Sequence, residues 1–204
     1  AEYQHEPHEE GSIFTDDLFN WGKPPRIDHF VSIVAHWDVA YAGTSTADYN
    51  AVRVWGLDRE NRYWLIGAYC RQSKMAAAVR WMVAFDKALP DSAVVRWQYE
   101  SQFWNDELER TVRDVCREER HDLRLGQAER GRANKYDRIL TLHPYYQNGR
   151  VWYSERLRAE QDVQVALAQL KGIEPGYSTH DDAPDADECA ISVQSREVLT
   201  QEWA

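Results

Sequence analysis

The chain has 204 residues, of which 43% are hydrophobic and 12% aromatic, and this composition excludes an intrinsically disordered protein. No apolar run approaches the roughly 20 residues of a membrane span, and the polar, acidic start has no secretory leader. The net charge of −10 argues against a freestanding, tight nucleic-acid binder, because such affinity depends largely on Lys and Arg neutralising phosphates.

The first segment, residues 1–29, combines several Pro and Gly residues with many acids. This composition predicts a linker with one short helix. The chain begins without Met, which we interpret as a piece of a longer protein or a processed product. The folded domain is therefore expected to span residues 30–204.

Three β-rich runs open this domain. Residues 30–38 (FVSIVAHWD) are apolar on both faces until His36, as expected of a strand buried on both sides. Two further strands are predicted over residues 51–57 and 63–70, with a hairpin turn at 58–61 between them. These three strands are expected to pair in sequence as an antiparallel meander.

The remainder of the chain alternates between helix and strand. Helical spacing of apolar residues predicts helices over residues 73–89, about 104–115, 138–142, 163–170 and 182–198. Further strands are predicted over residues 94–100, 123–125 and 151–153. A meander followed by alternating helices and strands predicts an α/β fold with a mixed central sheet flanked by helices, which is the element order of the ribonuclease H-like fold.

Acidic residues stand at the ends of two strands and at the start of the last helix. Asp38 ends the first strand and Glu100 the fourth, while Asp182 and Asp185 lie one helical turn apart. If the first and fourth strands are neighbours, these carboxylates lie close together and require a cation. Oxygen ligands favour Mg²⁺ or Mn²⁺, and two such ions about 4 Å apart can stabilise both the attacking and the leaving oxygen of phosphodiester hydrolysis. The alternative is chance, since the chain has 34 acids and Asp commonly caps helices.

Positive charge is concentrated in one segment of this acidic chain. It includes Arg130, Arg132, Lys135 and Arg138, which could follow the phosphates of DNA beside the metal site. The alternative is a solvated loop with ordinary basic residues.

Histidines and cysteines add little to this picture. His36 and His180 flank the acids and could orient a ligand, although a structural role is the simpler interpretation. The three cysteines, Cys70, Cys116 and Cys189, are far apart and odd in number. This pattern indicates neither a disulfide framework nor a zinc site built from thiolates.

Five short segments share a pattern with a known family. They are residues 1–14 (AEYQHEPHEEGSIF), 36–51 (HWDVAYAGTSTADYNA), 99–101 (YES), 135–151 (KYDRILTLHPYYQNGRV) and 180–186 (HDDAPDA). In this order they resemble the C-terminal nuclease domain of the large terminase subunits of tailed phages. Any one segment is a weak signal, but five in order at sensible spacing are specific.

The resemblance implies a metal-dependent DNA endonuclease with a ribonuclease H-like fold. The residues that it assigns to metal binding are the triad Asp38, Glu100 and Asp182, the accessory ligand Asp185 and the outer or second-metal ligand Asp48. The family often has Asp where this chain has Glu100. The sequence does not decide whether Asp181 or Asp182 is the ligand.

The resemblance also implies a setting. The substrate would be double-stranded phage DNA concatemers, cut with two Mg²⁺ or Mn²⁺ ions during genome packaging in the cytoplasm of an infected bacterium. An N-terminal ATPase domain would join through residues 1–29, but this chain has no Gly-x-x-x-x-Gly-Lys-Ser/Thr phosphate loop. The portal and the small terminase subunit would be protein partners, and no membrane would be involved.

Two other functions stay open. A RuvC-like junction resolvase belongs to the same superfold, but the terminase-like segment 1–14 argues against it. A non-catalytic packaging or docking module would fit the acidic surface, and it would become the leading hypothesis if the chain neither bound metal nor cut DNA.

Overall fold

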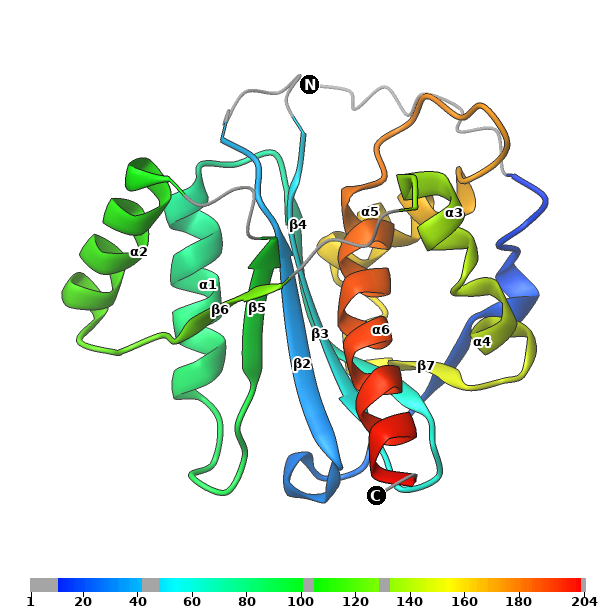
Figure 1. Ribbon diagram of the computed structural model, residues 1–204, viewed down its shortest axis with the longest axis horizontal. Coiled ribbons are helices and arrows are strands. Elements are labelled where there is room, and N and C mark those ends of the chain that lie inside the picture. The colour runs from blue at the N-terminus through cyan, green and yellow to red at the C-terminus, as the bar shows by residue number, and fades with distance from the viewer. Residues whose placement is uncertain (1–10, 42–47, 101–104, 129–132, 203–204) are drawn as a thin grey trace.

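A computed structural model describes residues 11–41, 48–100, 105–128 and 133–202. Seven strands form one mixed sheet in the order β1-β7-β4-β3-β2-β5-β6 (Figure 1). Their bounds are β1 Asn20–Gly22, β2 Ser32–Asp38, β3 Asn50–Leu57, β4 Tyr63–Arg71, β5 Arg96–Glu100, β6 Leu125–Ala128 and β7 Val151–Ser154.

Helices cover both faces of this sheet (Figure 1). One face carries α1 (Met75–Lys87) and α2 (Asp106–Glu119). The other carries α3 (Lys135–Leu140), α4 (His143–Gln147), α5 (Gln161–Lys171) and α6 (Asp182–Glu202). Short 3₁₀ turns lie at Asp16–Leu18, Ile27–His29 and Glu155–Leu157. None of the described helices combines the length and apolar character that crossing a lipid bilayer requires.

The strand pairing agrees with the meander expected from the sequence. Strand β2 pairs antiparallel with β3, β3 pairs antiparallel with β4, and β2 pairs parallel with β5 on its other side. Every residue of β3 is buried, because helices cover both faces at the centre of the sheet. The first and fourth predicted strands are thus neighbours, which the expected carboxylate cluster requires.

Part of the segment expected to be a linker belongs to the folded domain. Strand β1 pairs parallel with β7 at the edge of the sheet, with Asn20 opposite Trp152. Phe14 is fully buried, and its ring packs edge-on against Tyr146 at 5.5 Å between centroids. A three-residue strand is too short to show a periodic pattern, so this sequence resembled a linker. Residues 1–10 lie outside the described part of the chain.

The helix expected over residues 73–89 begins later, at Met75. Lys74 occupies the N-cap position and makes no side-chain capping hydrogen bond. The carbonyl of Ser73 instead accepts a hydrogen bond from the Asn50 side chain at 2.7 Å. A long-range polar contact therefore takes the place of the local cap.

Asn50 holds the chain where it leaves β2. Its Oδ1 accepts hydrogen bonds from Trp37 Nε1 and from the backbone N–H of Ala40, both at 3.0 Å. Its Nδ2 donates to the carbonyl of Ala40 at 2.9 Å. These contacts lie on both sides of Asp38 in sequence, so they restrict the backbone that carries its carboxylate.

A buried ion pair anchors α6 to the sheet. Asp187 accepts hydrogen bonds from Arg53 Nε at 2.6 Å and from Trp55 Nε1 at 2.7 Å. The Arg53 and Asp187 side chains are 1% and 2% exposed. Asp182 and Asp185 lie within the two helical turns before Asp187. The Arg53–Asp187 ion pair therefore also fixes the height of both carboxylates above the strand ends.

Candidate metal centre

The alternation of side chains along β2 decides which residues face α6. Val34 packs in the core on the α6 side, whereas Ala35 and Trp37 pack in the core under α1. Successive strand residues point to opposite faces, so His36 and Asp38 share the α6 side with Val34.

The same alternation brings Glu100 to this side of the sheet. His36 lies opposite Gln98 in the parallel register of β2 and β5. Trp97 and Tyr99 pack under α1, which leaves Gln98 and Glu100 toward α6. Asp38 and Glu100 therefore end neighbouring parallel strands with their side chains on one face.

A single ammonium group lies among the carboxylates. Lys135 begins α3 and contacts acids from β2 and from the start of α6. The distances from its Nζ are 2.7 Å to Asp181 Oδ1, 3.5 Å to Asp185 Oδ2, 3.6 Å to Asp38 Oδ2 and 4.0 Å to Asp182 Oδ1. Oxygens from separate elements thus surround one point, which is a donor set that suits a hard divalent cation.

The electrostatics of the cluster indicate a shortage of positive charge. Burial raises the pKa of Asp38 well above its usual range, and Lys135 only partly opposes this effect. The nearby carboxylates of Asp185, Asp182 and Glu100 raise the pKa of Asp38 further. Burial alone would lower the pKa of Lys135, but Asp38 and Asp185 outweigh it and raise that pKa. A divalent cation would relieve the repulsion that remains.

Asp181 and Asp182 occupy different environments. Asp181 accepts a hydrogen bond from the Tyr177 hydroxyl in addition to its contact with Lys135. Asp182 is more deeply buried, and its Oδ2 accepts a hydrogen bond from the backbone N–H of Tyr49 at 3.1 Å. Burial raises the pKa of Asp182, and the Tyr49 N–H opposes that rise.

Asp48 lies at the outer rim, away from the Lys135 contacts. Its side chain is 79% exposed, and its Oδ1 lies 3.7 Å from Nδ1 of His180. The same imidazole nitrogen lies 3.7 Å from Asp182 Oδ2. His180 therefore connects Asp48 to the buried acids.

The DNA contact expected of Arg138 stays a prediction, and the structure places this side chain among the acids. This residue is 5% exposed, and its Nη2 lies 2.7 Å from Asp185 Oδ1. Its Nη1 lies 3.4 Å from Glu188. Arg138 follows Lys135 by three residues in α3, which packs against α6, so both side chains point inward to the acids. The Arg138 side chain is thus directed to Asp185 and leaves little exposed surface for a phosphate.

The other expected phosphate contacts are placed differently. Lys135 is partly exposed and lies at the carboxylates, so it is accessible from solvent. Arg130 and Arg132 lie outside the described residues. The expectation of a phosphate-binding role stays untested for all three.

Sequence reasoning missed a pocket beside these acids. A cavity of about 330 Å³ is lined by His36, Glu100 and Arg138 together with Glu188 and Cys189 of α6. In sequence, Glu188 and Cys189 follow Asp185 by three and four residues, which places them on the same helical face. This spacing is the sequence signal that could have revealed the pocket.

We expect Lys135→Met to destabilise the protein when metal is absent, because the carboxylates then lose their central cation. The loss should be on the order of 1–2 kcal/mol, below the range for fully buried pairs since solvent reaches the Lys135 side chain. Thermal unfolding in EDTA measures this loss. Mn²⁺ should then raise the melting temperature more for the variant than for the parent chain.

Lys87→Met is the matched control, because Lys87 pairs with Glu119 on the exposed surface. An unchanged melting temperature in EDTA together with an unchanged Mn²⁺ response in Lys135→Met would refute the central position of this ammonium.

Comparison with known proteins shows which known fold this chain is similar to. No protein-family model and no curated protein sequence matches this chain. Among solved structures, it is similar to the nuclease domain of the P22 large terminase, with a TM-score of 0.60 and 14% sequence identity. The match covers 91% of this chain and 94% of that chain. The expected fold, a mixed sheet flanked by helices as in that nuclease domain, is therefore confirmed.

Proposed function

We propose that this chain is the nuclease domain of a phage DNA-packaging terminase and cuts double-stranded DNA concatemers by metal-dependent phosphodiester hydrolysis. The carboxylates gathered around Lys135 carry this proposal. Asp38 ends β2, and Asp182 and Asp185 lie in the first turns of the helix α6 above it. Glu100 ends the neighbouring parallel strand β5, in a fold similar to that of a terminase nuclease domain. The structural likeness favours the terminase role over the RuvC-like and docking alternatives.

In this proposal Asp38, Glu100 and Asp182 are the catalytic metal ligands. We favour Asp182 over Asp181 because Asp182 is deeply buried and held by the Tyr49 N–H. Two Mg²⁺ or Mn²⁺ ions would neutralise the scissile phosphate and activate the attacking water when bound.

The surrounding residues would orient these ligands. Arg138 fixes Asp185, the accessory ligand, through its guanidinium contact at 2.7 Å. His180 lies between Asp48 and Asp182 and contacts both carboxylates. Asp48 would therefore be an outer ligand of the metal site. When cations bind, they would replace Lys135 at the acids. The partly exposed ammonium of Lys135 would then be free to bind a phosphate oxygen.

DNA affinity would come largely from partners. The net charge of −10 leaves few basic groups for the phosphate backbone, although Arg130, Arg132 and Lys135 could contribute. An ATPase domain preceding residue 1 would hold the DNA, and the portal and small terminase subunit would position the complex in the host cytoplasm.

Plasmid cleavage tests the function directly. Supercoiled DNA incubated with the chain in Mn²⁺ or Mg²⁺ should be nicked and linearised, and EDTA should prevent both. A four-way DNA junction in a parallel reaction separates the alternatives, because a junction resolvase would cut it in preference to linear duplex. If metal binds but no DNA is cut, even at high protein and low salt and with the ATPase domain present, the nuclease proposal fails.

A further inference from the structure

The cavity between α6 and the β5–β6 end of the sheet has polar walls. On the sheet side it is lined by His36, Gln98 and Glu100, and on the helix side by Glu188 and Cys189. Three of these residues place possible metal ligands near one point. An imidazole nitrogen of His36, a carboxylate oxygen of Glu100 and the Sγ of Cys189 all lie within 4.8 Å of one another.

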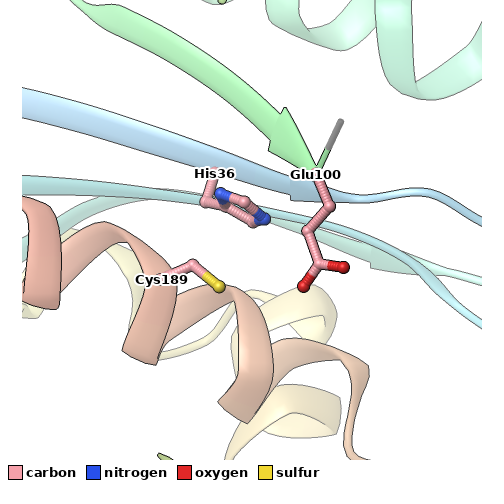
Figure 2. A group of neighbouring side chains, drawn as sticks. All are labelled: His36, Glu100 and Cys189. Carbon is pink, nitrogen blue, oxygen red and sulfur yellow. The ribbon is translucent and has the colours of Figure 1, made fainter. Parts of the chain in front are cut away.

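Figure 2 shows how these side chains come together from three elements. His36 projects from β2, Glu100 from the tip of β5 and Cys189 from α6, and their ends point into the same space. A second group overlaps this one, because Glu188, Asp185 and Cys189 also place ligand atoms within 4.8 Å of one another. Glu188 also lines the cavity, so it adds a carboxylate beside Cys189.

Unpartnered buried atoms at this cavity point to a ligand independently. His36 is 1% exposed, yet its Nδ1 has no hydrogen-bond partner among the described residues. Gln98 Oε1, on the same wall of the cavity, likewise has none within the described ranges. Nε and Nη2 of Arg138, which also lines the cavity, make no hydrogen bond within the described ranges either. Buried polar atoms are normally satisfied, so these exceptions at one cavity indicate that it accommodates a polar or charged species.

We propose that His36, Glu100 and Cys189 form a binding site for Zn²⁺ beside the carboxylate cluster. Nitrogen, sulfur and carboxylate oxygen together favour this borderline-soft ion, whereas Mg²⁺ prefers an octahedral shell of oxygens. Zinc bonds of about 2.0–2.3 Å require ligand atoms closer together than 4.8 Å, so small side-chain rotations complete the site. The cysteine spacing argues against a zinc site built from thiolates alone, but it is compatible with a site in which a single cysteine joins His and Glu.

The neighbouring guanidinium is compatible with this site. Arg138 Nη1 lies 3.7 Å from Cys189 Sγ, and its positive charge alone would repel a cation. Asp185 and Glu188 pair with Arg138, so its charge is already balanced. Burial and the carboxylates of Asp185 and Glu188 raise the pKa of the Cys189 thiol, and Arg138 opposes this rise only in part. The thiol therefore releases its proton as Zn²⁺ binds.

The site has a consequence that rests on the proposed nuclease function. Glu100 belongs both to the Zn²⁺ site and to the proposed catalytic ligands. Zn²⁺ bound to Glu100 withdraws it from the cluster at Asp38. Micromolar Zn²⁺ is thus expected to inhibit DNA cleavage in Mg²⁺.

Cobalt provides a readout that does not depend on activity. Co²⁺ added to the parent chain should produce a thiolate-to-cobalt charge-transfer band in the near ultraviolet, and Zn²⁺ should abolish it by displacement. Cys189→Ser should remove the band and weaken Zn²⁺ binding by more than about 100-fold, since even loss of an outer partner costs about 10- to 100-fold. His36→Gln should weaken Zn²⁺ binding similarly while leaving the thiol in place. Cys116→Ser, in α2, is the matched control and should retain both the band and the affinity.

Alkylation of the parent chain covers the case in which the variants do not fold. Zn²⁺ should protect Cys189, but not Cys116, from iodoacetamide, as read by peptide mass spectrometry. A parent chain without a cobalt–thiolate band, or a band that persists in Cys189→Ser, overturns the site, as does alkylation of Cys189 unaffected by Zn²⁺. If the site forms but the chain cuts no DNA, the zinc proposal stands and the nuclease proposal fails.

Discussion

Asp182→Asn is expected to reduce metal-dependent DNA cleavage on the order of 100- to 1,000-fold, the range for removing one electrostatic stabiliser of a charged transition state. The amide keeps the size of the carboxylate, and its oxygen can still accept the hydrogen bond from the Tyr49 N–H. The charge that would bind the cation is lost. Plasmid cleavage in Mn²⁺, compared with the parent chain at equal protein concentration, measures the effect.

The same substitution should not unfold the protein. Burial raises the pKa of Asp182, so at neutral pH its ionised form is less stable in the folded chain than in the unfolded chain. A neutral amide removes that cost. The melting temperature of Asp182→Asn in EDTA should therefore equal or exceed that of the parent chain, which would separate loss of function from loss of fold.

Two further variants sharpen this result. Asp122→Asn is the matched control, because its carboxylate is 84% exposed and its activity should be unchanged. Asp181→Asn should retain more activity than Asp182→Asn if Asp182 is the metal ligand. Equal cleavage by the parent chain and Asp182→Asn would remove the basis for the metal centre as assigned.

Asp187→Ala is expected to lower the free energy of unfolding by about 3–5 kcal/mol, the usual loss when one partner of a buried ion pair is removed. Arg53 would keep its charge in the core with no counter-ion, and Trp55 Nε1 would lose its acceptor. Urea unfolding followed by circular dichroism measures the change. Domains commonly have only 5–15 kcal/mol of stability, so the variant should be close to unfolding at ambient temperature.

An exposed ion pair supplies the comparison. Arg80 and Glu118 connect α1 and α2 at 2.8 Å with both side chains about half exposed. Glu118→Ala should change the unfolding free energy by no more than about 1 kcal/mol. If Asp187→Ala cost no more than Glu118→Ala, the buried pair could not be the anchor of α6.

Local sequence patterns were sufficient for the central elements. Residues 30–38 read as a buried strand because both faces are apolar, and β2 occupies Ser32–Asp38. The helix expected at 182–198 corresponds to α6, which begins at Asp182. By contrast, β1 was not predicted, because three residues are too few to show a hydrophobic period. The five-residue helix α4 is also too short to show one.

For the candidate site, too, some features could be predicted from the sequence and others could not. Its acids could be located from the ends of strands and the start of a helix, because the position of a residue in a regular element follows from local sequence. The orientation of Arg138 could not, since a basic residue in a polar segment ordinarily faces solvent. The packing of α3 on α6 turned it inward to Asp185.

Hydrophobic periodicity over a few neighbouring residues was enough to predict the α/β class, the meander and which acids stand at strand and helix ends. The position of Lys135 among the acids, and of Cys189 opposite His36 and Glu100, follows only from the folded arrangement. These contacts join residues between about 45 and 150 positions apart in the chain. Distance along the sequence carries no information about such pairs until the sheet order and the helix packing bring them together, because long-range contacts depend on the global arrangement of the elements.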